Sequence, residues 1–179
     1  MASNANEGNN RSLADTDIVD EGIAKWQAER PDIDSSAKAV VGRVVRLEDR
    51  ILQIVNPALR PFGLKYPSYS VLVTLRVNGE PFEMSPKLLK HSLLLTSGGL
   101  STLLERIEQR GLIERLPDPN DRRGVIVRLT SKGRELADRA MVVHAQVEHQ
   151  IIAGLSKEEQ SLLAKMLGKL LRHLSKPVR

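Results

Sequence analysis

Hydrophobic residues recur at helical spacing along most of this chain of 179 residues. After a break at residues 31–35, apolar positions three and four residues apart predict one long helix that ends near Pro57 to Pro61. They are Val40, Val44, Leu47, Ile51, Ile54 and Val55. The same spacing predicts further helices over residues 16–29, 67–77, 131–154 and 157–174. We therefore expect a mainly α-helical protein.

The pattern changes between residues 84 and 130. Ser85 followed by Pro86 is typical of a helix start and predicts a short helix that runs to about His91. A second helix is expected from Ser97 to Arg110, and two short helices with a tight connection form a helix-turn-helix. The β-rich runs 112–116 and 125–129 enclose a stretch of turn-forming residues, which predicts a β-hairpin.

The second helix of the pair has small and hydroxylic residues in its first turn. Small side chains permit close approach to DNA, and free amides at a helix start can meet phosphate. Hydroxyls bond bases or phosphates and arginine prefers guanine, so this helix could read a DNA groove. An ordinary core helix with a solvated outer face is the alternative. The predicted DNA-binding residues of the helix pair are Ser85, Ser97, Gly98, Ser101, Thr102 and Arg106.

The tip of the predicted hairpin is basic. Arg122 and Arg123 have the reach to enter a minor groove, where the negative potential attracts arginine. Asp121 is expected to hold a nearby arginine through a charge-assisted hydrogen bond rather than to touch DNA. A solvated charged hairpin without a ligand is the alternative interpretation.

Charge is distributed unevenly along the chain. Lys and Arg number 27 against 22 Asp and Glu, a formal net charge of +5. Residues 1–36 are rich in acids, whereas residues 84–134 are rich in bases, so we expect the middle of the chain to meet nucleic acid. Residues 1–14 are polar and small, which predicts a flexible tail.

Composition excludes several classes of function. The chain has no cysteine, which rules out disulfides and thiolate sites. No uncharged apolar run approaches the roughly 20 residues that span a bilayer, so we expect a cytoplasmic protein without a membrane partner. His144 and His149 are not spaced for one zinc site, and we expect the four histidines to be surface residues. We predict no metal, no cofactor and no catalytic residues, and hence no enzyme.

The wing segment resembles that of the MarR family of transcriptional regulators. The resemblance rests on residues 112–115, on residues 118–125 from Asp118 to Val125, and on residues 128–133. It implies a mainly α winged helix-turn-helix protein with a small β-hairpin wing, assembled as a triangular homodimer on a pseudo-palindromic operator in double-stranded DNA. It also implies that Arg123 takes the place of the wing arginine in the minor groove.

The resemblance implies a domain organisation as well. Residues 15–179 would form a single domain after the tail. Within it, residues 15–60 and 131–179 would supply the dimerisation helices, and residues 61–130 would form the DNA-binding lobe.

Residues 26–34 and 41–47 are similar to a narrower branch of urate-responsive and PecS-like regulators, in which an extra N-terminal helix brings a Trp near the effector. Many relatives carry an acid where this chain has Ser70, which favours an effector other than urate. Aromatic rings stack on a ring, hydroxyls meet a phenol and Arg binds a carboxylate, so we predict a small aromatic acid or phenolic effector. The predicted effector-binding residues are Trp26, Arg43, Arg46, Tyr66, Tyr69 and Ser70.

Alternatives remain at this point. Trp26 could simply pack the first helix against the dimer core. The leading hypothesis for the whole chain is a ligand-responsive DNA-binding repressor. The alternative is a winged-helix module that binds protein partners and has no effector control. Two features favour it: Glu105 on the presumed DNA face and the acidic N-terminal segment. A helical enzyme acting on an aromatic acid is a weaker third hypothesis.

Overall fold

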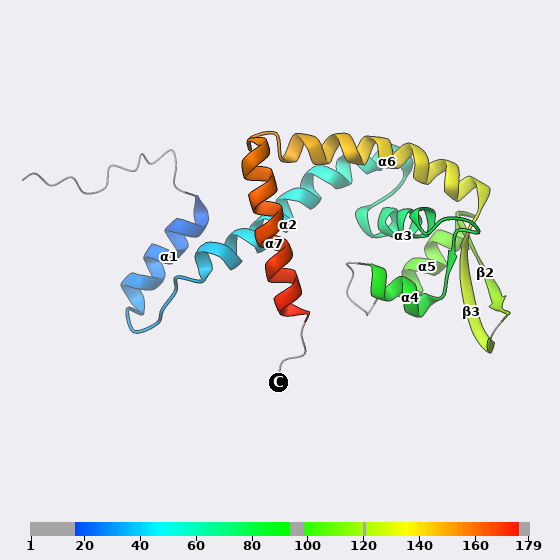
Figure 1. Cartoon of the computed structure of the whole chain (residues 1–179), viewed down its shortest axis with the longest axis horizontal. Helices are drawn as coiled ribbons and strands as arrows, with labels where there is room; N and C mark the ends of the chain where they lie inside the picture. Colours follow the sequence, from blue (N-terminus) through cyan, green and yellow to red (C-terminus); the bar gives the residue numbers. More distant parts are fainter. Residues whose placement is uncertain (1–16, 94–98, 120, 176–179) are drawn as a thin grey trace, which may run out of the picture. The chain divides into compact units, whose positions relative to one another are not determined.

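The computed structural model describes residues 17–93, 99–119 and 121–175, with the side chains of Arg122 and Arg123 outside this description. The chain divides into two compact units, and the boundary along the sequence lies between Ile51 and Leu52. We call them the N-terminal and the C-terminal unit and describe each by itself (Figure 1).

The N-terminal unit contains helix α1 (Ile18–Glu29) and the first part of α2 (Lys38–Leu59). Asp17 caps α1, since its side chain accepts a hydrogen bond of 2.8 Å from the backbone N–H of Val19. The Arg43 guanidinium of α2 donates to the carboxylates of Asp17 and Asp20, at 2.8 and 2.7 Å. These charge-assisted bonds hold the two helices together.

The loop between α1 and α2 contains a buried hydroxyl. Ser35 is 5% exposed, and within the described part of the chain its Oγ has no hydrogen-bond partner. An unpaired buried polar group costs about 1–3 kcal/mol, so we expect Ser35→Ala to raise the free energy of unfolding of this unit by about 1 kcal/mol. Urea unfolding followed by the fluorescence of Trp26, the only Trp of the chain, measures this. A variant less stable than wild type would contradict the prediction.

The C-terminal unit contains the end of α2, further helices and a small sheet. After the end of α2 and a 3-10 turn (Arg60–Phe62) come α3 (Tyr66–Val77), β1 (Glu83–Met84), α4 (Pro86–Ser92) and α5 (Leu100–Gln109). Strands β2 (Ile113–Asp118) and β3 (Asp121–Leu129) and helices α6 (Ser131–Ile151) and α7 (Lys157–Leu174) complete it. The predicted mainly helical fold with a hairpin is confirmed.

The sheet is antiparallel, with β3 between β1 and β2. Glu83 of β1 lies opposite Arg128, and Ile113 of β2 lies opposite Leu129. The sequence analysis did not predict β1, because a strand of two residues carries no hydrophobic alternation of its own. Its pairing depends on β3 being in place.

A core of aliphatic side chains joins the helices and the base of the sheet. Helix α3 packs against α6, and α5 contacts β2. Burying each leucine, isoleucine or valine of this core contributes about 1.5–3 kcal/mol. The fully buried residues include Leu72, Leu75, Leu89, Ile107, Leu112, Val127, Ala137 and Ala140.

Local sequence features set several of the helix ends, and the predicted start at Ser85 is confirmed. Ser85 and Thr130 cap α4 and α6, and Ser156 forms a capping box with Glu159 at the start of α7. Gly111 follows α5 with a positive φ of 68°, a conformation that glycine adopts without steric cost.

The expectation that all four histidines are surface residues is wrong for His144. This side chain of α6 is 8% exposed, and its ring stacks on Tyr69 of α3 with 4.5 Å between the ring centroids. The packing of α3 on α6 covers it, which the spacing of histidines along the sequence could not reveal.

Candidate nucleic-acid interface

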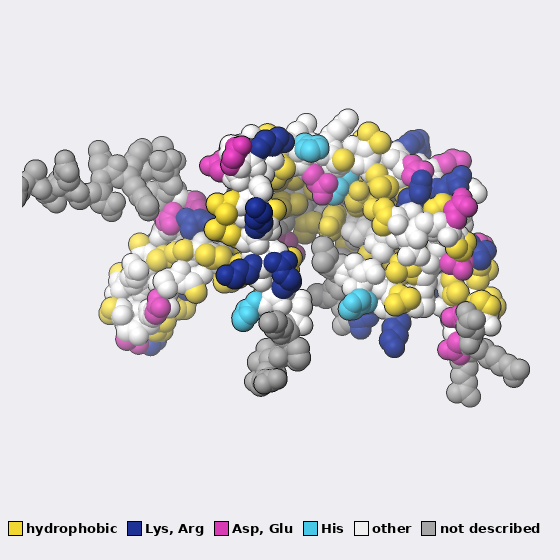
Figure 2. All heavy atoms as spheres, in the orientation of Figure 1, with side chains coloured by type: hydrophobic (Ala, Val, Ile, Leu, Met, Phe, Trp, Pro, Cys, Tyr) yellow, Lys and Arg dark blue, Asp and Glu magenta, His cyan; other side chains and the backbone are white. Residues whose placement is uncertain are grey.

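Helices α4 and α5 form the helix-turn-helix. Ser85 begins α4, and its Oγ accepts a hydrogen bond of 3.3 Å from the backbone N–H of Leu88, so the hydroxyl caps the helix. Lys87, Lys90 and His91 are exposed on α4. Figure 2 shows dark blue Lys or Arg side chains and a cyan His on the visible surface where Figure 1 places α4. The first helix of such a pair crosses the DNA backbone, so Lys87 and Lys90 are suited to phosphate, a role that the sequence analysis missed.

Helix α5 has one buried and one exposed face. Leu104 and Ile107 are buried, whereas Ser101, Thr102 and Arg106 are all exposed. The three predicted DNA-binding residues therefore share the solvent side of one helix. Glu105 is exposed as well. Ser97 and Gly98 of the predicted set lie outside the described residues.

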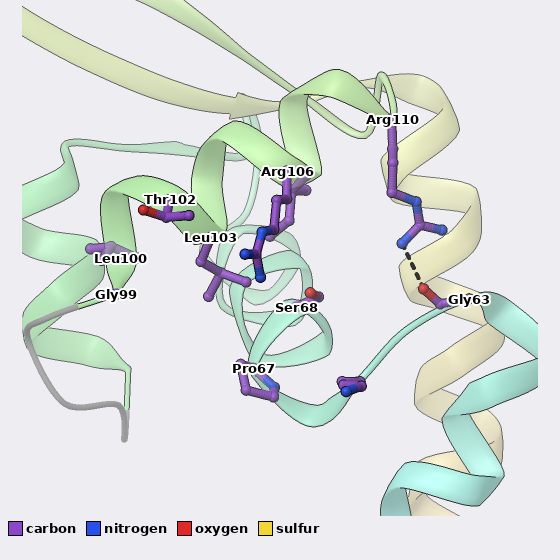
Figure 3. Close-up of a pocket in the computed structure, with 11 residues that line it drawn as sticks. Gly63, Pro67, Ser68, Gly99, Leu100, Thr102, Leu103, Arg106 and Arg110 are labelled. Carbon is purple, nitrogen blue, oxygen red and sulfur yellow. Dashed lines mark hydrogen bonds between the residues drawn. The ribbon is translucent and has the colours of Figure 1, made fainter.

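A groove of about 700 Å³ lies between α5 and the start of α3. Figure 3 shows Arg106 and Arg110 of α5 on one side and Pro67 and Ser68 of α3 on the other. Lys65 also lines it, and among the described lining residues there is no carboxylate. Lys65 thus adds a cation beside the exposed face of α5, whereas the Arg110 guanidinium donates to the carbonyl oxygens of Gly63 and Phe62. Lys65 and Arg110 were not predicted, because only the tertiary structure brings the start of α3 to α5.

The wing is the hairpin of β2 and β3. At its base, Arg128 donates to Glu83 at 2.8 Å and lies 3.9 Å from Glu114, so this arginine braces the sheet. At its tip, the backbone of Arg122 and Arg123 belongs to β3. Their side chains lie outside the described residues, and their contact with DNA stays a prediction.

Gly124 is required by the close packing of the wing tip. A Cβ at this position would lie 2.8 Å from the Cβ of Asp118 and 3.2 Å from the carbonyl oxygen of Asp121. We expect Gly124→Ala to open the tip and to weaken binding to operator DNA about tenfold, or about 1.4 kcal/mol. Fluorescence anisotropy at fixed salt measures the loss, and Gly154→Ala, with nothing within 4 Å, is the control. Equal affinities of the two variants would contradict this role of the tip.

Three of the predicted effector residues lie in the N-terminal unit. Trp26 and Arg46 line the same mainly apolar hollow of about 690 Å³ between α1 and α2. The Lys38 ammonium lies 3.8 Å from the centre of the Trp26 ring, a cation–π contact. Arg43 instead pairs with Asp17 and Asp20. Of the two predicted carboxylate-binding arginines, Arg46 is therefore the one that reaches the hollow beside Trp26.

The carboxylate of Asp17 is stabilised by this arrangement. Desolvation acts to raise its pKa, but the backbone N–H groups of Asp20 and Val19 and the guanidinium of Arg43 together hold the pKa below its usual value. The ion pair with Arg43 is consequently present at neutral pH.

The other three predicted effector residues lie in the C-terminal unit on α3. The rings of Tyr66 and Tyr69 stack on His144, and Ser70 is half-buried beside them in sequence. Nδ1 of His144 lies 3.4 Å from the carboxylate of Glu148, and burial raises the pKa of Tyr69 to about 12. Tyr69 is 6% exposed. Its phenol is therefore a neutral part of the core between α3 and α6.

A helix-turn-helix with an exposed second helix, followed by an antiparallel wing with a basic tip, defines a winged helix DNA-binding protein. A model of the MarR family matches residues 62–124, which span the helix-turn-helix and most of the wing. The HTH-type transcriptional regulator PecS of Dickeya dadantii (strain 3937) is 32% identical over 164 residues, or 92% of this chain and 96% of PecS. The chain therefore belongs to the MarR family of transcriptional regulators.

Two further similarities extend this result. The transcriptional repressor MprA of Escherichia coli (strain K12) is 28% identical over 130 residues, 73% of each chain. The structure of a mutant MarR from E. coli complexed with operator DNA matches with a TM-score of 0.68 and 27% identity, over 78% of this chain and 99% of that one. This chain is thus a DNA-binding transcriptional regulator and not an enzyme. The relatives favour DNA binding over the protein-interaction module.

Within the described residues, no helix is long and apolar enough to cross a membrane.

Proposed function

We propose that this protein is a homodimeric repressor that binds a pseudo-palindromic operator and is released by a small aromatic acid or phenolic effector. The observation that carries the proposal is the exposed face of α5, with Ser101, Thr102 and Arg106 beside a groove lined by further cations. Related proteins support it: MprA is named a repressor, and MarR has been crystallised on operator DNA.

Exposed apolar stripes support the dimer. None of the residues of α7, all of which the structure describes, is buried, although the helix is strongly amphipathic. A monomer would leave this stripe in water, which is unfavourable by about 25 cal/mol per Å². The same holds for the first half of α2. The exposed residues are Val40, Val41, Val44, Val45, Leu47, Leu162, Leu163, Met166, Leu167, Leu170, Leu171 and Leu174.

The hollow beside Trp26 supports the effector. Its volume of about 690 Å³ falls in the range of small-molecule sites. Its walls are mostly apolar, and its lining includes two cations: Lys38, whose ammonium lies over the face of the Trp26 ring, and Arg46. An aromatic carboxylate would place its ring against the apolar wall and its charge near Arg46. We propose that Tyr66, Tyr69 and Ser70 serve the effector response from α3, where the two tyrosine rings stack on His144 of α6.

A ligand releases the repressor only if it binds more tightly to a conformation that does not fit DNA. Two recognition helices of a dimer must lie about one helical turn of DNA apart, roughly 34 Å, to engage both half-sites. An effector that changes this spacing weakens both contacts at once.

Anisotropy titration of DNA from upstream of the protein's own gene tests the proposal. We expect sequence-dependent binding at moderate salt, relieved by one or more compounds from a panel of aromatic acids, phenols and urate, with a parallel change in Trp26 emission. Binding that no compound relieves would contradict the effector. A complex with one protomer per duplex would contradict the dimer.

A further inference from the structure

Three segments of the C-terminal unit meet at Arg110, the residue that ends α5. Its guanidinium donates to the carbonyl oxygens of Gly63 at 2.7 Å and of Phe62 at 3.3 Å, in the turn that directly follows α2. Its own carbonyl oxygen accepts a hydrogen bond of 2.8 Å from Nζ of Lys132 on α6. Figure 3 shows the Arg110 side chain extending from the end of α5 to Gly63.

The turn after α2 is shaped to receive this guanidinium. Gly63 has a φ of +63°, and a Cβ there would lie 2.9 Å from a terminal nitrogen of Arg110. Only glycine combines this backbone conformation with so close an approach at low cost. A guanidinium can reach two carbonyl oxygens from one planar group, which the single ammonium of a lysine does less well.

The remaining support for the end of α5 comes from α6. Thr130 Oγ1 donates to the carbonyl oxygen of Gly111 at 2.8 Å, next to the Lys132 contact. In the described part of the chain, Arg110 is thus the side chain whose hydrogen bonds join the end of α5 to the turn after α2. Any shift of the end of α2 moves the carbonyls of Phe62 and Gly63, and with them the end of α5.

We infer that Arg110 is a positioning residue, which fixes the recognition helix α5 relative to the end of α2 and so sets the operator spacing that the protein accepts. Its guanidinium binds protein carbonyls, so its contribution to DNA binding is geometric. The inference goes beyond the proposed function and rests on the proposed dimer, because a single lobe has no half-site spacing to set.

The test uses a duplex selected from random sequence by the wild-type protein, and the same duplex with one base pair inserted at its centre. We expect wild type to bind the lengthened duplex about 100-fold more weakly, on the order of the contribution of one half-site. Arg110→Met should reduce this discrimination to about tenfold or less, because α5 can then follow the displaced half-site. The slope of log K against log salt should stay at the wild-type value, since no phosphate contact is removed.

Two further variants make the result specific. Gly63→Ala crowds the guanidinium away from the turn but keeps its charge, and should lose spacing discrimination like Arg110→Met. Arg139→Met removes a different cation, which lines a hollow together with Arg110. This variant should discriminate between the two duplexes as strongly as wild type. Because Gly63→Ala leaves Arg110 in place, it also tests the inference if Arg110→Met fails to fold.

Other outcomes would overturn the inference. If Arg110→Met and Gly63→Ala both keep the wild-type discrimination, Arg110 has no positioning role. If Arg110→Met binds both duplexes equally more weakly and its salt slope falls by about one, Arg110 is a direct phosphate contact. A wild-type protein that binds both spacings equally would contradict the proposed dimer itself, and with it the basis of the inference.

Discussion

Replacing Gly133 with alanine is expected to destabilise the protein by about 3 kcal/mol, the upper end for overpacking a well-packed core. Gly133 is buried in the first turn of α6, where an added Cβ would overlap the carbonyl oxygen of Leu112 and lie 2.9 Å from Cδ1 of Leu129. The opposing atom is backbone at the start of β2, so no rotamer change relieves the clash. Helix α6 must move away from the base of the wing.

The measurement is thermal unfolding followed by circular dichroism, at equal protein concentration because oligomers melt at concentration-dependent temperatures. We expect Tm to fall by roughly 10 °C, given about 2–4 °C per kcal/mol for a protein of this size. Gly154→Ala is the matched control, because its Cβ meets nothing within 4 Å, and its stability should change by less than about 0.5 kcal/mol. If the Gly133→Ala protein has the same Tm as wild type, α6 does not contact Leu112 this closely.

Reversing the charge of Arg123 is expected to lower operator affinity about 100-fold or more, while Tm changes little. Arg123 lies on β3 at the wing tip, and we predict from the resemblance to the family that it takes the place of the wing arginine. Arg123→Glu would replace an attraction to the negative minor groove with a repulsion, and a dimer would suffer it at both half-sites. Each lost phosphate or groove contact also reduces the salt dependence of binding.

Anisotropy titrations at three salt concentrations measure both the affinity and the slope of log K against log salt. The matched control is Arg139→Glu, which reverses a charge on α6 and should affect DNA binding much less. If Arg123→Glu binds operator like wild type, the wing does not contact DNA. A variant that loses DNA binding but still binds a protein partner would show that the wing serves DNA binding and not the protein interaction.

The local sequence determined the elements of this protein. The starts of α4, α6 and α7 depend on residues within one turn of them: Ser85 and Thr130 bond nearby backbone N–H groups, and Ser156 pairs with Glu159. The exposed and buried faces of α5 follow from the spacing of its leucines, because a helix turns through a fixed angle per residue. The exposed face of α5 and the wing were therefore predictable, and the resemblance of the wing segment to the MarR family indicated the class of protein.

Only the tertiary structure decided which groups these polar and aromatic side chains contact. Arg43 donates to the carboxylates of Asp17 and Asp20 at 2.8 and 2.7 Å, a pairing that the sequence analysis did not predict, and its contact with an effector stays a prediction. His144 was predicted to be exposed, but the packing of α3 on α6 encloses it beside Tyr69. Arg110 meets Gly63, which lies 47 positions away along the sequence. Such contacts depend on how elements pack, because the chain's periodicity specifies which face of a helix is covered and not which residues of another element cover it.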